Sequence, residues 1–564
     1  MAREAFRQIA LQRVDLWPVR NEHVTKIAEG TFSFLNHQLQ IGAIDSNGNM
    51  TVDWSPESTR LWRFHLQSQE FLLKVAANEG PEFAALLMQS WLSQPDHRHP
   101  MKDPDAWHPF CISRRLPVWL CVDAIHDVSS IIGPDFFDSV AGQVQWLHRN
   151  MEWDLGGNHL LENLTALYMA GCFLEPVAPL DLRGIERCLL DQLKIQILPS
   201  GEHYERTPTY HTLMLVCVLQ CVEAARFVKS DAELPLVEIA NKMARFLDSI
   251  TSPDDSIPLL ADSVVAETPD LKQLQNWCHR LNIFGTECCK TSDYWVINRP
   301  EKHQLLCDLG PLACDHLPAH GHADLFQITA SFFGQQGIVD TGNYQYEPGD
   351  MRMRCRRTDA HNVLQLGELE HCDIWSSFRM GRRGHPIARH EGETSTTRWV
   401  ATAHDAFSGP SGRILIAYAS QWTILDWYSA ADRLQDTVRS PLHWHPSWTL
   451  EASQDSATWK ADHKNDSYGT ITIVGDGSST AHIVIEEGIY CPDFGELFAN
   501  QVATLTSKMQ QVGWLRWRIL LDENAELIDE SVEISSDEIN IASENENLLQ
   551  LNIKDGHLLS AQMA

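Results

Sequence analysis

The stretch YWVINRPEKHQLLCDLG, Tyr294 to Gly310, marks the point where the hydrophobic pattern of the chain changes. It contains two short apolar runs, YWVINR and HQLLCDLG, each bounded by turn residues. Runs of this kind are typical of β-strands. They recur downstream as FQITASFF, RWVATAHDAF, RILIAYAS, WTILDWY, GTITIVG, AHIVIEEG and WRILLDE. The region after about residue 295 is therefore predicted to be all β, built from stacked antiparallel sheets.

Before this stretch the apolar residues recur at helical spacing. The predicted helices are Leu61 to Asn78, Glu82 to Ser93, Leu116 to Ile132, Phe136 to Arg149, His159 to Phe173, Ile185 to Leu198, Tyr210 to Phe227, Leu236 to Ile250 and Leu271 to Leu281. Many successive helices in one domain favour a layered or toroidal array of antiparallel hairpins. We predict one domain over residues 1–290 and a second over residues 291–564. As an alternative, residues from about 480 to 564 form a separate small β layer within the second domain.

The composition excludes some classes of partner. With 564 residues the chain is too long for one hydrophobic core. Its formal net charge of -31 repels nucleic acid and anionic membranes, so neither is expected as a partner. An anionic small ligand stays possible, because a local basic cleft outweighs distant charges beyond a Debye length of roughly 8 to 10 Å.

The cysteines and the first residues bear on the compartment. The 14 cysteines have no framework spacing, which favours a reducing environment. The start, MAREAFRQIALQRVDLWPVR, has no apolar core of the kind that a signal peptide needs. On the sequence given we therefore expect a cytoplasmic protein. If a leader was removed, the protein is periplasmic or secreted.

The first polar motif is GGNHLLENLTALYMAG, Gly156 to Gly171. The two glycines precede an apolar helix, so Asn158 and His159 fall in its first turn, with Glu162 three residues after His159. An Asn at a helix start is most often a cap. The polar density here exceeds what capping requires, and the Asn158 amide could also donate to a carboxylate.

A second motif is GEHYERTPTYHTLML, Gly201 to Leu215. Pro208 suits the first turn of a helix, which Tyr210 and His211 then continue. A tyrosine serves as a general acid or base when a cation or a developing charge is near. The alternative is a packed ring with a solvated hydroxyl.

A third motif, LPAHGHADLF, places His320 and His322 two residues apart. On a regular strand both rings would face the same side. Asp340 ends the next apolar run and His361 opens another. Two histidines and an aspartate suit Zn²⁺ or a similar ion, although a hydrogen-bonded polar cluster would look the same.

Arginines concentrate in MRMRCRR and FRMGRRG, which hold seven of the 44 Lys and Arg residues within 32 positions. A guanidinium recognises a carboxylate or sulfate through two parallel hydrogen bonds. A solvated strand face is the alternative. No P-loop, Rossmann glycine fingerprint, HExxH or GxSxG motif is present in the sequence, so nucleotide chemistry and serine hydrolysis lack support.

Five motifs in order, GGNHLLEN, HYERTPTYH, HGHADLFQI, GIVDTGNYQY and DAHNVLQL, resemble the heparinase II/III-like polysaccharide lyases. The early FSFLNHQLQIG and VDWSPESTRLWRFHLQSQEFL are similar to the amino-terminal part of that family. The resemblance implies a multidomain α+β fold, in which an incomplete (α/α) toroid precedes an antiparallel β-sandwich. It also implies cleavage of uronic-acid polysaccharides by β-elimination, with an acidic polysaccharide or oligosaccharide as the partner.

The resemblance also implies roles for the catalytic groups. Removal of the C5 proton of a uronate creates an enolate-like dianion, so its carboxylate must first be neutralised or polarised. By resemblance Asn158 takes that role, with His159 assisting or acting as base. Tyr210 would protonate the departing glycosidic oxygen and could also abstract the C5 proton of one epimer. His320 would act as base for the other epimer, and Glu162 would orient His159.

The remaining roles concern metal and substrate. By resemblance His322, Asp340 and His361 hold a divalent metal, Zn or Mn, with a structural role. His320 is then expected to point toward substrate and His322 toward the metal, which requires a kink at Gly321. Predicted substrate contacts are Tyr344, Arg352 and Arg356.

The sequence leaves the substrate and the reaction class open. The predicted function is a lyase acting on glycosaminoglycans of the hyaluronan, chondroitin or heparan sulfate type, giving unsaturated uronate oligosaccharides. One alternative is an alginate or oligoalginate lyase, and another is a non-catalytic protein of uronate-polysaccharide binding or assembly. A hydrolase on the same scaffold would need two opposed carboxylates, for which Glu162, Glu202 and Glu205 are the candidates.

Overall fold

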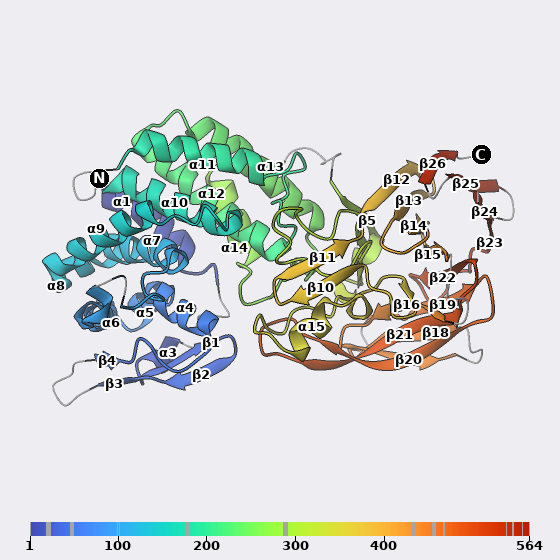
Figure 1. Cartoon of the computed structure of the whole chain (residues 1–564), viewed down its shortest axis with the longest axis horizontal. Coiled ribbons are helices and arrows are strands. Elements are labelled where there is room, and N and C mark those ends of the chain that lie inside the picture. Colours follow the sequence, from blue (N-terminus) through green and yellow to red (C-terminus); the bar gives the residue numbers. More distant parts are fainter. Residues whose placement is uncertain are drawn as a thin grey trace. The chain divides into compact units, whose positions relative to one another are not determined.

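The computed structural model describes residues 2–17, 24–44, 50–98, 100, 102–174, 180–285, 292–430, 436–453, 458–465, 468–536, 538–543, 546–554 and 557–562. The chain forms two compact units (Figure 1). The first combines Met1–Asp248 with Val264–Lys290, and the second combines Ser249–Ser263 with Thr291–Ala564.

The first unit is an incomplete α/α toroid. Its helices are α1 (Ala2–Arg13), α3 (Val24–Ile27), α4 (Arg60–Ser68), α5 (Leu72–Asn78), α6 (Pro81–Ser93), α7 (Pro109–His126), α8 (Val128–Ile132), α9 (Pro134–Arg149), α10 (Gly157–Phe173), α11 (Leu182–Gln196), α12 (Pro208–Val228), α13 (Glu233–Ile250) and α14 (Leu271–Arg280). All nine predicted stretches contain helix. Two of them are broken, at Gln69 and Asp127, where the backbone adopts a left-handed conformation with φ of 55° and 53°.

The amino-terminal part holds elements that the hydrophobic pattern did not predict. They are helices α1 and α3 and two small hairpins, β1 (Thr31–Phe34) with β2 (His37–Gln40) and β3 (Gly42–Ile44) with β4 (Met50–Val52). The strands of these hairpins are only three or four residues long, too short for an alternating pattern to stand out.

Helices α10 and α12 form the centre of the first unit. They pack against each other, and α10 also packs against α7 and α11. Among the described helices, α12 is the one long and apolar enough to cross a membrane by length and composition, but 78% of its apolar window is buried inside the folded chain. Its apolar surface is therefore accounted for by packing in the core.

The second unit is a β-sandwich. Its largest sheet has eight antiparallel strands in the order β12-β13-β14-β15-β22-β19-β18-β17. They are β12 (Pro386–Glu393), β13 (Arg398–His404), β14 (Ser411–Ala417), β15 (Gln421–Ser429), β22 (Val512–Leu520), β19 (Ile471–Gly477), β18 (Thr458–His463) and β17 (Trp448–Ala452).

Two four-stranded sheets share a core with one face of the large sheet. One has the order β5-β6-β7-β8, and the other β20-β21-β16-β9. Their strands are β5 (Tyr294–Arg299), β6 (His303–Asp308), β7 (Ile328–Phe332), β8 (Gln335–Ile338), β20 (Ala481–Tyr490), β21 (Phe498–Lys508), β16 (Thr437–His443) and β9 (Gln365–Leu366). Short helical segments lie at Pro300–Lys302, Thr358–Ala360 and α15 (Asp350–Arg356).

The alternation of side chains along the central strands explains the layers. On β13 to β15, Val400, Leu415 and Ile424 belong to the core shared with the two four-stranded sheets. Their chain neighbours Ala401 and Leu425 belong to a second core on the opposite face. Successive strand residues point to opposite faces, so a strand buried on both sides must be apolar at consecutive positions.

The acidic tail forms the layer on that opposite face. Strands β23 (Glu530–Ile534), β24 (Glu538–Ser543), β25 (Glu546–Lys554) and β26 (His557–Gln562) make a four-stranded sheet. Ile541 and Leu551 of this sheet pack on the large sheet. Strands β20 to β22 lie in the other sheets, so the small separate layer begins near residue 530 rather than 480.

The segment Ser249–Ser263 belongs to the second unit although the chain around it belongs to the first. The side chain of Gln304 donates to the Thr251 carbonyl at 3.0 Å. The Gln336 amide donates to Asp254 and Ser256 at 3.1 and 3.0 Å. These bonds attach the segment to the sheet β5-β6-β7-β8, and they bring Asp262 into the second unit.

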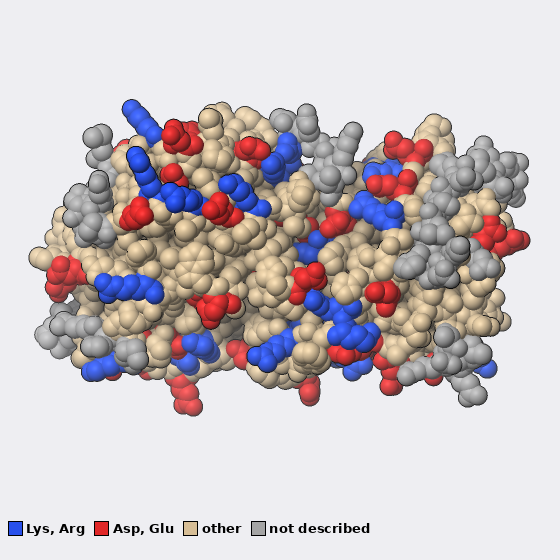
Figure 2. Space-filling model, turned by 45° about the horizontal axis from the view of Figure 1, so that its top comes forward, with Lys and Arg blue, Asp and Glu red and all other residues tan. Residues whose placement is uncertain are grey.

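Acidic and basic side chains are interspersed on the face that Figure 2 shows, and most of that face is neither. The negative charge of the chain is thus spread out rather than gathered there in one patch. Local arrangements of charge, rather than a field of one sign, must select an anionic ligand on such a surface.

Candidate active site and metal-ligand cluster

The start of α10 brings two of the predicted motifs together. Gly156 and Gly157 have φ of 69° and 58°, a conformation that glycine adopts without strain. The first amides of the helix are then capped from another segment. Gly157 N donates to the Tyr204 hydroxyl at 3.1 Å, and Asn158 N donates to Glu205 Oε1 at 2.7 Å. A carboxylate at this position also interacts favourably with the helix dipole.

Asn158 therefore is not the cap of α10. It lies one residue inside the helix and is 2% exposed. Its side-chain amide makes no hydrogen bond to any residue that the structure describes. The amide of Asn163, one turn later, is by contrast committed to Ser113 and Glu152 at 3.3 and 3.1 Å. Asn158 thus presents an uncommitted donor and acceptor at the start of a helix.

His159 is held by a carboxylate that the sequence analysis missed. Its Nδ1 lies 3.1 Å from Glu152 Oε1. An ionised carboxylate only accepts hydrogen bonds, so Nδ1 carries the proton. Burial disfavours the imidazolium, but the hydrogen bond and the charge of Glu152 outweigh it and raise the pKa of His159. Burial likewise opposes the charge of Glu152, and His159 outweighs it, so the pKa of that carboxyl is lowered.

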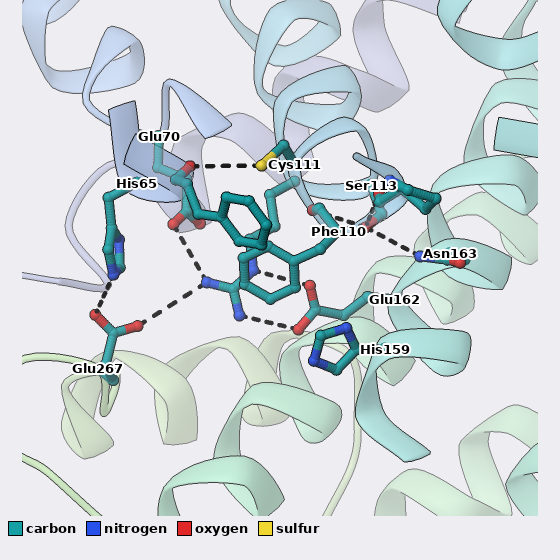
Figure 3. A network of polar contacts seen from close by, with 12 residues as sticks. His65, Glu70, Phe110, Cys111, Ser113, His159, Glu162, Asn163 and Glu267 are labelled. Atoms are coloured by element: carbon teal, nitrogen blue, oxygen red, sulfur yellow. Dashed lines mark hydrogen bonds and ion pairs between the residues drawn. The ribbon is translucent and has the colours of Figure 1, made fainter. Parts of the chain in front are cut away.

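Glu162, which was predicted to orient His159, pairs with Arg114, and the carboxylate bonded to the His159 ring is that of Glu152. Arg114 donates from Nε to Glu162 Oε2 at 2.9 Å and from Nη2 to Oε1 at 3.0 Å. Figure 3 shows Glu70, Glu162 and Glu267 turned toward this one guanidinium. Burial alone would lower the pKa of Arg114, but the carboxylates, led by Glu162, raise it well above its ordinary value.

Arg114 also connects this network to the neighbourhood of His159. Its guanidinium lies 4.3 Å from the centre of the Phe110 ring, and the Phe110 and His159 rings are 5.0 Å apart. The structure therefore gives His159 a polar partner on one atom and an aromatic wall on one face. About a quarter of its side chain is exposed.

Tyr210 is the third residue of α12, which begins at Pro208 as predicted. The segment before it supplies Tyr204 and Glu205, the two caps of α10. The two motifs that carry Asn158, His159 and Tyr210 are therefore joined by hydrogen bonds within the first unit.

In the second unit His320 and His322 do not lie on a regular strand, because residues 311–327 form an irregular loop. A side chain at Gly321 would collide with the backbone of Leu312, whose oxygen would lie 2.5 Å from the added Cβ. The backbone around the two histidines is thus fixed by close packing rather than by strand pairing.

Both histidines bind one carboxylate, Asp262. His320 Nδ1 lies 2.9 Å from Oδ2, and His322 Nε2 lies 3.0 Å from Oδ1. The guanidinium of Arg352 pairs with both oxygens of the same carboxylate. Burial raises the pKa of Asp262, but Arg352 and the two histidines outweigh it and hold the pKa well below its ordinary value.

His322, Asp340 and His361 gather as predicted. All three are buried, and one potential ligand atom from each lies within 4.8 Å of the others. His361 Nδ1 and Asp340 Oδ2 are 2.7 Å apart. His322 Nδ1 and His361 Nε2 are buried and have no hydrogen-bond partner among the described residues. Two unpartnered ring nitrogens beside a carboxylate fit a divalent cation, and the bond from His322 Nε2 to Asp262 is the outer support that metal-ligating histidines commonly have.

The predicted substrate contacts Arg352 and Arg356 are wrong. Both are fully buried, and their donors are committed. Arg352 donates to Asp262, to Asn343 at 3.2 Å, and to the Ser377 carbonyl at 2.8 and 3.1 Å. Arg356 donates to the carbonyls of Gly321, Ser376 and Ser377. Tyr344, whose side chain is partly exposed, stays a prediction.

Comparison with known families decides the lineage. The heparinase II/III N-terminus model matches residues 31–286, and the heparinase II/III-like C-terminal model matches residues 290–535. This chain belongs to the heparinase II/III family. No match was found among curated protein sequences.

Several solved structures share the fold of this chain. A structure of heparinase III is 15% identical, with a TM-score of 0.68, and covers 92% of this chain and 86% of its own. A mutant of the heparan sulfate lyase HepC from Pedobacter heparinus is 14% identical, with a TM-score of 0.63, over 97% and 88% of the two chains. The chondroitin AC lyase of Streptomyces coelicolor A3, in complex with chondroitin sulphate, is 10% identical, with a TM-score of 0.53, over 97% and 88%.

Proposed function

We propose that this heparinase II/III family member is a polysaccharide lyase that cleaves uronic-acid-containing glycosaminoglycans by β-elimination. The observation that carries the proposal is the Asn158 amide, buried at the start of α10 yet uncommitted to any described residue, next to a histidine that holds its own carboxylate partner. Family membership and the solved relatives named above support the class of reaction.

Asn158 is the residue that receives the uronate carboxylate. A neutral amide donates a hydrogen bond to it without adding a charge, and a donor placed where negative charge develops lowers the barrier to C5 deprotonation. Glu205 already occupies the Asn158 backbone amide, so the contribution of Asn158 comes from its side chain.

Three groups move protons in the proposed reaction. Because Nδ1 of His159 is bonded to Glu152, Nε2 is the atom that assists at the carboxylate or takes the C5 proton. Tyr210 donates a proton to the leaving glycosidic oxygen. For the opposite epimer His320 takes the C5 proton, and Asp262, bonded to its Nδ1, holds the imidazole in place.

The metal is proposed to be Zn or Mn, held by His322, Asp340 and His361. When bound, it supplies a positive charge that fixes these three side chains, and the proton transfers are assigned to other residues. His322 is attached to Asp262 as well, so the ligand cluster also supports the carboxylate that holds His320.

The carboxylates of the first unit argue against a glycoside hydrolase. Glu162 forms two hydrogen bonds with Arg114, and Glu202 pairs with Arg206 at 3.3 Å. Glu205 caps α10. A hydrolase needs one carboxylic acid that can give up a proton and a second carboxylate opposed to it. The candidate acids are instead engaged in ion pairs and a helix cap.

The proposal is tested by screening hyaluronan, chondroitin, dermatan, heparan sulfate, heparin and alginate for the ultraviolet absorbance of an unsaturated uronate product. Absorbance growth on one of the glycosaminoglycans is the expected result. Absorbance growth on alginate alone would mean that the substrate is alginate rather than a glycosaminoglycan. Binding without absorbance growth, with divalent metal supplied, would mean that the protein binds the polysaccharide and is not a lyase.

A further inference from the structure

The hairpin of β10 (Cys372–Ser376) and β11 (Arg379–Arg383) exposes aromatic side chains at its tip. Trp375 is 69% exposed and Phe378 is 42% exposed, within the five residues WSSFR, 375–379. A soluble protein rarely leaves large apolar side chains together in solvent without a binding role.

The indole of Trp375 is held in place despite its exposure. It packs over Gly381 of the paired strand, where an added Cβ would lie only 2.1 Å from the ring. Any side chain at position 381 would displace the ring. Gly381 therefore gives one part of the indole a flat support and leaves the rest to solvent, so little side-chain entropy is lost when a ligand covers it.

The hairpin that carries Trp375 is anchored at its turn. The carbonyl of Ser377 accepts hydrogen bonds from both Arg352 and Arg356, and the carbonyl of Ser376 accepts one from Arg356. Both guanidiniums are fully buried. The arginines that were expected to contact substrate thus position the turn of this hairpin.

One cation at the tip, Arg379, has no polar contact with the part of the chain that the structure describes. Arg382 bonds Asp373 and two carbonyls, and Arg383 bonds the carbonyls of Cys314 and Asp315. Arg379 is exposed, and its side chain makes no hydrogen bond or ion pair with the residues that the structure describes. A guanidinium in this state is available for a carboxylate or a sulfate.

The tip is close to the candidate base of the second unit. The Phe378 and His320 rings are 6.3 Å apart. Tyr346 lies between further rings of the cluster, 6.1 Å from His320, 5.4 Å from Phe378 and 4.9 Å from Phe494. Phe378, Tyr346, Phe494 and His320 therefore form one contiguous cluster in the second unit, and Trp375 lies three residues before Phe378 in the same hairpin.

We propose that the β10–β11 tip is a subsite for an acidic saccharide. It lies adjacent to the sugar of the substrate on which His320 acts. The indole of Trp375 covers the apolar face of a sugar ring, and Arg379 binds the carboxylate or sulfate of the same or the next sugar. The proposal rests on the lyase function proposed above, which supplies the class of ligand. The charge of Arg379 selects for an anionic saccharide over a neutral one.

The test is Trp375→Ala, measured on the glycosaminoglycan that the absorbance screen identifies. A binding subsite that does not take part in the chemistry should raise KM about tenfold with kcat nearly unchanged. Arg379→Gln should raise KM mainly at low salt, because screening removes part of its attraction anyway. Phe498→Ala removes another exposed aromatic side chain, 48% exposed on β21, and Lys508→Gln removes an exposed cation, so both serve as controls.

A second readout separates this proposal from the lyase proposal. Calorimetric titration of wild type and Trp375→Ala with heparan sulfate and chondroitin sulfate oligosaccharides measures binding whether or not turnover occurs. Weaker binding by the variant supports the subsite even if no substrate is cleaved. Unchanged KM and unchanged binding in Trp375→Ala, in an enzyme that does cleave, would overturn the subsite alone.

Discussion

Oε1 of Glu152 lies 3.1 Å from Nδ1 of His159, seven residues along the chain and across the Gly156-Gly157 turn. The second oxygen of Glu152 accepts from Asn163 at 3.1 Å, so the carboxylate is fixed by α10 itself. The imidazole is consequently held in one orientation and one tautomer, with the proton on Nδ1.

Glu152→Gln should lower the pKa of His159, because the charge that stabilises the imidazolium is removed. An NMR titration of the His159 ring measures this directly. If His159 acts as base, the acidic limb of kcat/KM against pH moves to lower pH in the variant. Glu186→Gln, which alters a carboxylate bonded to Tyr168 in the same unit, is the control and should leave the limb in place. An unmoved His159 titration would remove Glu152 from this role.

The same pair predicts a pH dependence of stability. The raised pKa of His159 adds stability that is full below its ordinary value of 6.5 and is lost as pH rises through the folded-state pKa. The lowered pKa of Glu152 adds stability that is full above 4.5 and is lost as pH falls through the folded-state pKa. The difference in Tm between wild type and Glu152→Gln should therefore be largest between these two values. A difference that does not change with pH would show that the pair contributes nothing.

Tyr210→Phe should lower kcat by about 100- to 10,000-fold, the usual contribution of a general acid or base. The fold should be retained, since only a hydroxyl is removed. Tyr168→Phe is the matched control, because it removes a hydroxyl bonded to Glu186 in the first unit and should keep kcat near that of wild type. Near-normal kcat in Tyr210→Phe would mean that another group protonates the leaving oxygen.

Metal analysis of the purified protein should find zinc or manganese, and His361→Gln should reduce the amount bound. Chelation should lower Tm, because an ion that binds only the folded state stabilises it. His445→Gln changes a histidine that bonds Ser447 instead, and it should retain the metal. Equal metal content in wild type and His361→Gln would place the ion elsewhere.

Asp262→Ala should destabilise the protein by about 3–5 kcal/mol, because it leaves the buried Arg352 guanidinium without its counter-charge. Urea unfolding measures the loss. Asp373→Ala breaks an ion pair with Arg382 in which both side chains are half exposed, and such pairs are worth about 0–1 kcal/mol. Similar losses in the two variants would contradict the view of Asp262 as the centre of a buried charge cluster.

Most of the fold could be predicted from local hydrophobic patterns in the sequence. The helical spacing of residues such as those in His159–Phe173 and the apolar runs of β13 to β15 reflect burial that repeats along one element, and burial of that kind is visible in one segment at a time. The breaks at Gln69 and Asp127 were not visible, because an interruption of one to three residues that begins at a left-handed residue leaves the apolar periodicity almost unchanged.

The candidate site was also predicted only in part. The triad of His322, Asp340 and His361 was predicted from neighbouring motifs and does gather. Asp262 was missed, since it lies 58 residues before His320 in a segment with no distinctive spacing. Arg352 and Arg356 were misjudged, because a sequence shows that arginines cluster but not whether carbonyls and a carboxylate already occupy their donors.

The placement of Ser249–Ser263 constrains how such a protein can be divided or recombined. A gene cut at codon 290 would separate Arg352 from Asp262, and the carboxy-terminal product would have to bury a guanidinium that has lost its counter-ion. The two units therefore cannot be exchanged between relatives as simple cassettes. A working chimera would have to carry the fifteen-residue insertion together with the sandwich that it serves.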